Sequence, residues 1–225
     1  MPGVGPLVVS SGLQATDRRS FLEMKEELAR AYNSGEETVM SIAGDAINAA
    51  IRVYNRYNWP WEVLKVPDFN TASGTETYTV PAPFKAPLSC HVVTSSRPSR
   101  RLGFIPFSSY MTEYSLRADG NPTLYTFENL HETGQVTFWP RPGAVETMRI
   151  CFYRRTPTLK YDDSPLDVPL EAEEGYQSWA WYEFVKRIGG EWGASRITSA
   201  LSEARAARIE LVAMVSERGD PVGLI

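Results

Sequence analysis

The stretch YTFENLHETGQVTFWPRPGAVETMRICFYRRTP, from Tyr125 to Pro157, contains three runs in which apolar and polar residues alternate. Alternation with a period of two is typical of half-buried β-strands, whose successive side chains point to opposite faces. Turn residues separate the runs at Thr133-Gly134 and at Pro142-Gly143. This arrangement predicts two consecutive antiparallel hairpins, and therefore a β-meander.

The same period extends upstream, so that strands are expected through most of the region from Trp61 to Pro157. The other strand-like runs are TETYTVP, APLSCHVVTS and NPTLYTFE. One interruption, PFSSYMTEYSLRADG, predicts a short helix from about Ser108 to Arg117 that Gly120 closes.

Helical patterns flank this β region on both sides. Ser20 and Glu23 have the spacing of a capping box at the start of a first helix, and Ser34 and Glu37 repeat that spacing for a second helix. Small residues in the second helix, such as Gly44, suggest close packing against another helix. Two further helices are expected downstream, the first opened by acidic residues at 171, 173 and 174 and the second running over about 192–216.

The predicted fold class is α+β, with a four-helix-type bundle built from the N- and C-terminal helices and an inserted antiparallel β domain. An irregular N-terminal arm is expected over residues 1–19. The bundle takes residues 20–58 and 170–217, and the β domain with its one short helix takes residues 59–169. Residues 218–225 form an extended C-terminal tail, because Pro221 prevents the last helix from continuing.

Composition allows a sizeable core, because 43% of the 225 residues are hydrophobic. No apolar run is long enough for a membrane span, and the N-terminus lacks the basic region of a signal peptide. Folding in a reducing cytosol is therefore expected. Charge is uneven: residues 76–160 hold 10 basic and 6 acidic side chains, whereas residues 161–225 hold 6 and 12. No concentrated basic face typical of duplex binding is evident.

The sequence offers little catalytic chemistry. A metal site could draw on Cys90, His91, His131 and Cys151, but adjacent residues on a strand point to opposite faces. There is no nucleophile elbow, no phosphate-binding glycine loop and no separated pair of carboxylates, since Asp162 and Asp163 are adjacent. We therefore expect no enzyme activity, no metal and no cofactor.

Two groups of residues leave alternatives open. Trp59 and Trp61 flank a proline where the second helix ends, and they suit either a core plug or, with Trp139, a carbohydrate- or peptide-binding β module. The basic residues Arg97, Arg100 and Arg101, like the pair Arg154-Arg155, suit single-stranded nucleic acid, an acidic surface of a partner subunit, or solvated strand edges.

Four segments resemble the head-to-tail adaptor (connector) proteins of tailed bacteriophages, the group that includes tail tubular protein A. They are SIAGDAINAAIRVYNRYNWPWE, YTVPAPFKAPLSCHVV, GNPTLYTFENLHETGQVTFWPRP and MRICFYRRTPTLKYDDSPLDVP. The likeness covers about residues 38–215. Its motifs are hydrophobic and turn patterns of moderate specificity.

The resemblance implies a structural protein of the virion, made in the host cytoplasm. It would form a ring, usually of twelve copies, beneath the portal protein. The ring would extend the channel through which double-stranded DNA passes without sequence-specific binding, and would carry the next tail component, whether nozzle, tube or stopper. It implies no membrane association.

The C-terminal tail is a candidate docking element. It is extended, follows a long helix and ends in two aliphatic residues. We expect it to insert into a groove on the portal or on a neighbouring subunit; the alternative is a frayed terminus. Its candidate binding residues are Gly219, Asp220, Pro221, Val222, Gly223, Leu224 and Ile225.

Overall fold

The computed structural model describes residues 18–80, 84–114, 118–128, 134–188, 193–217 and 223–224. The chain divides into two compact units. Unit 1 takes in Met1–Val53 and Thr158–Leu211, and unit 2 takes in Tyr54–Pro157 and Val212–Ile225. Helices from both ends of the chain therefore enclose an inserted β region in the sequence, which confirms the predicted fold class. Across the described part of the chain, no helix has the length and apolar character needed to cross a bilayer.

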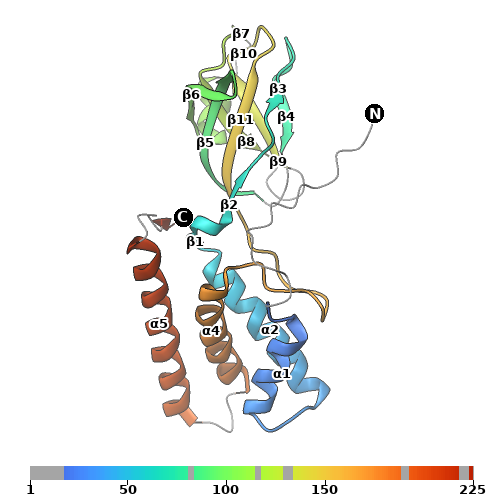
Figure 1. Ribbon diagram of the computed structural model, residues 1–225, viewed down its shortest axis with the longest axis vertical. Coiled ribbons are helices and arrows are strands. Elements are labelled where there is room, and N and C mark those ends of the chain that lie inside the picture. The colour runs from blue at the N-terminus through green and yellow to red at the C-terminus, as the bar shows by residue number, and fades with distance from the viewer. Residues whose placement is uncertain are drawn as a thin grey trace. The chain divides into compact units, whose positions relative to one another are not determined.

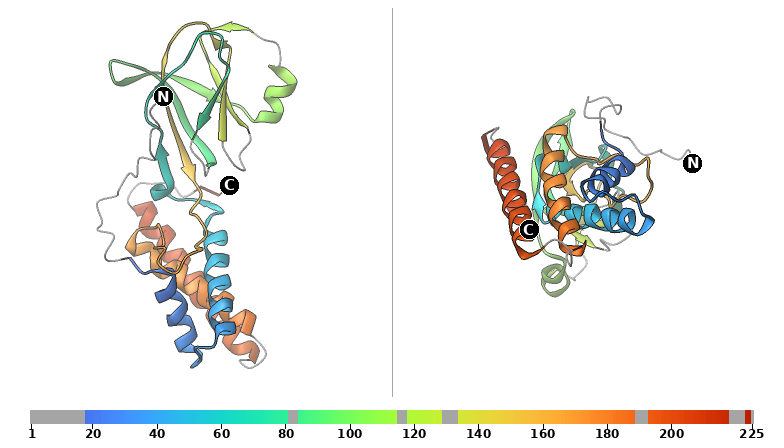
Figure 2. Two further views of the ribbon diagram at one scale, coloured as in Figure 1. Left: turned by 90° about the vertical axis from the view of Figure 1, so that its right-hand side faces the viewer. Right: turned by 90° about the horizontal axis from the view of Figure 1, so that it is seen from below.

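Unit 1 is built from four helices (Figure 1). They are α1 (Phe21–Ala31), α2 (Glu37–Tyr54), α4 (Leu170–Ile188) and α5 (Gly193–Glu217). Helix α4 lies between α5 on one side and the pair α1 and α2 on the other, as the right-hand view of Figure 2 shows. The N-terminal helices thus pack with the C-terminal ones, as predicted. Contacts such as the edge-on pair Tyr32–Phe184, with ring centroids 6.4 Å apart, join the two sets.

The start of α1 confirms the predicted capping box. The Ser20 hydroxyl accepts a hydrogen bond from the Glu23 backbone N–H at 3.2 Å, and the Glu23 carboxylate accepts one from the Ser20 N–H at 2.7 Å. Each bond satisfies a backbone donor that the helix itself leaves unpaired. One face of α1 is buried, and it carries Phe21, Met24 and Leu28.

The second predicted capping box is wrong. Helix α2 begins at Glu37, so Ser34 lies too far upstream to cap it, and its hydroxyl instead accepts a hydrogen bond from the Glu36 N–H at 3.3 Å. The expected close packing is present, because a Cβ placed on Gly44 would lie 3.1 Å from the Phe21 ring of α1. Glycine at this position lets the two helices approach.

The main feature of unit 2 is an eight-stranded sheet with the order β2-β11-β5-β6-β8-β9-β4, in which β3 also pairs with β11. All neighbours are antiparallel except β6 and β8, so the sheet is mixed. Its strands are β2 (Val63–Lys65), β3 (Phe69–Asn70), β4 (Thr77–Val80), β5 (Phe84–Thr94), β6 (Arg97–Phe104), β8 (Leu124–Glu128), β9 (Gly134–Trp139) and β11 (Thr147–Arg154).

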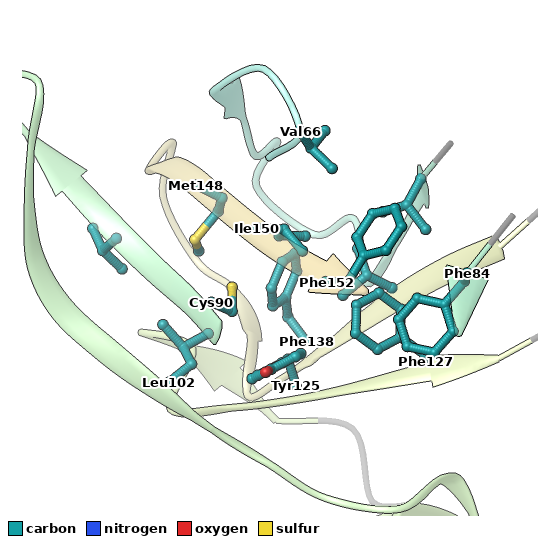
Figure 3. Packing of buried hydrophobic residues seen from close by; sticks show 13 residues of the cluster. Val66, Phe84, Cys90, Leu102, Tyr125, Phe127, Phe138, Met148, Ile150 and Phe152 are labelled. Carbon is teal, nitrogen blue, oxygen red and sulfur yellow. The ribbon is translucent and has the colours of Figure 1, made fainter. Parts of the chain in front are cut away.

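The sheet is curled around its own core (Figure 3). Tyr78 of β4 contacts Phe69 of β3, with ring centroids 5.5 Å apart, although β3 and β4 lie near opposite edges of the strand order. The buried cluster on the inside draws on most strands. Its members are Val66, Val80, Phe84, Cys90, Val92, Leu102, Tyr125, Phe127, Val136, Phe138, Met148, Ile150 and Phe152.

The first predicted hairpin is confirmed, since β8 and β9 pair directly with each other. The second is wrong: β11 pairs with β2, β3 and β5 and not with β9. Pro140 and Pro142 lack backbone N–H donors, so the segment between β9 and β11 is poorly suited to a hairpin ladder. It instead forms β10 (Arg141–Pro142), which pairs in parallel with β7 (Asp119–Gly120).

Strand β6 was not among the predicted strands. It pairs with β5 across a two-residue turn made by Ser95 and Ser96, whose φ angles are 49° and 66°. Hairpin turns of this kind require positive φ at both positions and usually carry Asn or Gly there, so a Ser-Ser turn gives little signal. The parallel partner β8 is reached through α3 (Phe107–Glu113), which is shorter than the helix predicted over 108–117; residues 115–117 lie outside the described chain.

Candidate assembly surfaces

The predicted basic cluster lies on β6, and its three arginines have different roles. Arg100 is bound within unit 2: its guanidinium donates to the Pro122 carbonyl at 2.7 Å and to both carboxylate oxygens of Glu146 at 2.9 and 3.0 Å. These bonds tie β6 to the segments before β8 and β11. Arg100 therefore serves the sheet rather than a free binding surface.

Arg97 and Arg101 are exposed, and neither makes a hydrogen bond or ion pair with another described residue. Arg101 differs from Arg97 because it borders a pocket of about 430 Å³. The other lining residues are Pro87, Leu88, Leu102, Gly103, Phe104 and Tyr125. The structure thus separates two arginines that the sequence places in one cluster.

The pocket is mostly apolar, but it also contains two polar side chains that make no hydrogen bond or ion pair with a described residue. Leu88 and Phe104 are 39% and 44% exposed at its rim. Tyr125 is 3% exposed, and its hydroxyl makes no hydrogen bond with any described residue. Burial raises the pKa of this phenol, so the hydroxyl remains a hydrogen-bond donor at neutral pH. The lining of the pocket therefore combines apolar side chains with a tyrosine, which can donate a hydrogen bond, and a basic arginine.

A row of nitrogen-bearing side chains, formed by Arg101, His91 and Arg149, crosses the outer face of the sheet. His91 of β5 is the cross-strand neighbour of Arg101 and also of Arg149 on β11. Asp68 accepts hydrogen bonds from Arg149 at 2.8 and 2.6 Å, and this contact lowers the pKa of the Asp68 carboxyl. The charge of Arg149 is thus balanced by Asp68, whereas Arg101 forms no ion pair with a described residue.

Tryptophan burial argues against the alternative of a β module that binds through exposed tryptophans. Trp59 is fully buried, and its indole stacks on that of Trp61 with centroids 4.9 Å apart and planes 8° apart. The indole N–H of Trp59 donates to the Tyr54 carbonyl at 3.0 Å, whereas its backbone N–H is a separate donor. Trp139 is half-buried against Tyr114. The Trp59 pair is therefore a core plug where α2 ends.

A buried ion pair lies beside this plug within unit 2. Lys85 donates hydrogen bonds to the Glu62 carboxylate and to the Tyr57 carbonyl, and both charged side chains are 1% exposed. The Glu62 carboxylate also accepts hydrogen bonds from the backbone N–H of Trp59 at 3.3 Å and from the Thr156 hydroxyl at 3.2 Å. Burial raises the pKa of Glu62 and lowers that of Lys85, and each charge opposes the shift of the other.

The C-terminal tail is described only at Gly223–Leu224, and the other residues of the predicted tail from 218 to 225 lie outside the described chain. Gly223 and Leu224 form β12, which pairs antiparallel with β1 (Tyr57–Asn58). The two described residues of the tail thus pair with a strand of the same unit. The sheet it joins has two strands and two residues in each.

The cysteine and histidine residues that were considered as metal ligands, and for which no metal was expected, are not brought together in the described chain. Cys90 is buried in the core, where desolvation raises the pKa of its thiol to about 12, and Cys151 lies on the opposite face of the sheet. His131 lies outside the described chain. No group of three or more His, Cys, Asp or Glu side chains among the described residues is arranged to hold a metal ion.

Unit 1 presents one prominent aromatic side chain. Tyr161 is 72% exposed, more than any other large apolar side chain in the described residues. It opens a turn closed by a hydrogen bond from the Ser164 N–H to the Tyr161 carbonyl at 3.0 Å. The turn is fixed to α1, because Lys25 donates to the Asp162 carboxylate at 2.6 Å. Asp163 is exposed and has no ion pair or hydrogen bond with another described residue.

The sequence matches the family described as SU10 adaptor protein over residues 19–220, which is most of both units. The chain belongs to this family. Membership identifies the protein as a structural adaptor of a phage, in agreement with the predicted class. Among curated proteins, no match to the chain is found.

Sequence reasoning missed the features that distinguish these surfaces in the adaptor. The Lys85–Glu62 pair joins residues 23 positions apart, and neither residue stands out from other charged residues in the sequence. The pocket beside Arg101 depends on β6, which was not predicted. Tyr161 lies next to a polar, proline-containing segment in the sequence, and this position weakly indicates an exposed aromatic side chain.

Proposed function

We propose that this chain is the head-to-tail adaptor of a tailed phage. Copies form a ring, with twelve as the expected number, under the portal protein. The ring extends the DNA channel and offers the attachment surface for the next tail component. The observation that carries this proposal is membership of the SU10 adaptor family over residues 19–220. The finer likeness to tail tubular protein A rests on the sequence segments quoted above.

The physical properties of the two units support such a role. A ring protomer needs two different surfaces that match each other around a closed rotation. A wall along packaged DNA should not hold phosphates, since basic contacts would retain the duplex. The acidic balance of residues 161–225 suits a wall that repels DNA weakly, and the basic balance of residues 76–160 suits contacts with protein.

The C-terminal residues Gly219–Ile225 are proposed to dock on the portal or on a neighbouring copy. Support comes from the short β1–β12 pairing, because two residues in each strand give few hydrogen bonds to hold the tail. Strand addition of this kind also lets an extended segment pair with a different edge. Arg97 and Arg101 are proposed as partner-binding residues on the same unit.

Co-sedimentation of the full-length chain with purified portal protein tests the proposal. Wild-type chain is expected to sediment with the portal in a fixed stoichiometry. A variant lacking Gly219–Ile225 is expected to keep its melting temperature and circular dichroism but to stay at the top of the gradient. Lys65→Ala provides the control, since Lys65 is exposed on β2 of unit 2 and should not affect docking. A wild-type chain that never sediments with portal would refute the proposed function.

A further inference from the structure

We propose that Tyr161 and Asp163 of one copy bind the pocket that Leu88, Arg101 and Tyr125 border on a second copy. The contact joins a protruding turn of unit 1 to a hollow of unit 2 on the neighbouring molecule. It deepens the proposed ring and rests on that function. The partner is therefore a second copy of this chain, bound head to tail.

The pocket is chemically suited to a tyrosine followed by a carboxylate. Its volume of about 430 Å³ falls within the range in which proteins enclose drug-sized groups, so one aromatic side chain fits. Leu88 and Phe104 give an apolar rim. The hydroxyl of Tyr125 makes no hydrogen bond with a described residue, so it is available to an incoming group. An incoming acceptor oxygen would satisfy this hydroxyl, and a carboxylate would neutralise Arg101.

The turn at Tyr161 supplies both groups on a rigid base. The backbone N–H groups of Phe21 and Leu22 donate to the carbonyls of Ser164 and Asp162, each at 2.9 Å, and so fix the turn to the start of α1. Asp162 is held by Lys25, which leaves Tyr161 and Asp163 as the projecting side chains. A pre-ordered aromatic anchor loses little entropy on binding, which favours a role as an interface hot spot.

Among the described residues of a single copy, the groups on both sides of the proposed contact lack binding partners. Tyr161 remains 72% exposed, and neither Arg101 nor Asp163 has a charged partner among the described residues. The projecting group and the hollow belong to different surfaces of the same chain. Contacts between two different surfaces are heterologous, and they repeat from copy to copy until a ring closes.

A charge-exchange experiment tests the pairing. Arg101→Glu and Asp163→Arg are each expected to raise the protein concentration needed for oligomers by about tenfold or more, alone or on portal, because a central interface contact is lost. The double variant Arg101→Glu with Asp163→Arg should recover most of the loss. Lys65→Glu is the matched control, since Lys65 lies exposed on β2 of the same sheet and does not line the pocket. Native mass spectrometry reads the oligomers, and melting temperature confirms that each variant folds.

A cross-linking experiment tests proximity directly. In a Cys151→Ser background, Leu88→Cys with Lys160→Cys, which keeps Tyr161 in place, is expected to form intermolecular disulfides and a ladder of multimers, whereas either single cysteine should stop at dimers. Rings that assemble normally from Arg101→Glu chains, without cross-links in the double-cysteine chain, would overturn this contact and leave the proposed function standing. A wild-type chain that forms no oligomer, alone or on portal, would refute both.

Discussion

Replacing Lys85 by methionine should destabilise unit 2 far more than the loss of an ordinary surface lysine. Lys85→Met leaves the Glu62 carboxylate buried at 1% exposure with only the Trp59 N–H and the Thr156 hydroxyl as donors. Removing one member of a buried ion pair costs about 3–5 kcal/mol of unfolding free energy, because an uncompensated charge stays in a low-dielectric site. Urea unfolding at pH 7.5, followed by tryptophan fluorescence, measures this loss through Trp59.

The loss should depend on pH with a definite sign. In Lys85→Met, burial without the lysine raises the folded-state pKa of Glu62 above its unfolded value. The folded state then binds more protons than the unfolded state, so the variant gains stability as the pH falls and loses it as the pH rises. Its deficit relative to wild type should shrink as the pH falls from 7.5 to 5.5, by at most about 1.4 kcal/mol for each pH unit.

Two comparison variants separate charge burial from general damage. Lys65→Met makes the same substitution at an exposed lysine on β2 and should change stability by less than about 0.5 kcal/mol. The double variant Glu62→Gln with Lys85→Met should recover at least half of the loss, since the amide keeps an acceptor for the Trp59 N–H without a buried charge. A Lys85→Met deficit no larger than that of Lys65→Met, or independent of pH, would refute the reasoning.

Three further outcomes follow from burial and capping. Trp59→Ala should cost about 3–5 kcal/mol because a fully buried indole is lost, and a cost no greater than that of Trp139→Ala in the same urea unfolding assay would contradict the core plug. The Cys90 thiol should resist alkylation at pH 8 until the chain unfolds, as mass spectrometry of labelled peptides would show, whereas fast labelling in the folded chain would mean that its burial is wrong. Ser20→Ala should cost about 1 kcal/mol in thermal unfolding, while Ser20→Asp should not; equal losses would exclude capping as the cause.

Features that depend on neighbours in the sequence could be predicted. Three such features are the Ser20–Glu23 capping box, the β8–β9 hairpin and the close helix approach at Gly44. The first two depend on residues a few positions apart, and the third depends on the absence of a side chain at a single position. The acidic start of α4 is equally local, since Glu171 and Glu173 lie in its first turn. These signals gave the correct fold class because helices and hairpins are specified by short-range patterns.

Features that depend on partner choice could not be predicted. Alternation shows that β11 is a strand, but it does not say whether β11 pairs with β9 or with β5, and chain proximity favoured the wrong partner. For the same reason, the different contacts of the arginines in the basic cluster could not be predicted. Arg100 and Arg101 are adjacent in the sequence, yet one is bound to Glu146 and the other borders a pocket, since adjacent residues of β6 point to opposite faces.

Cryo-electron microscopy of portal protein mixed with an excess of the full-length chain tests the central claim most directly. We expect portals capped at one end by a closed ring of identical copies, with Tyr161 of each copy lying against the Arg101 pocket of the next. Bare portals surrounded by single molecules, at concentrations well above those in an infected cell, would contradict the account.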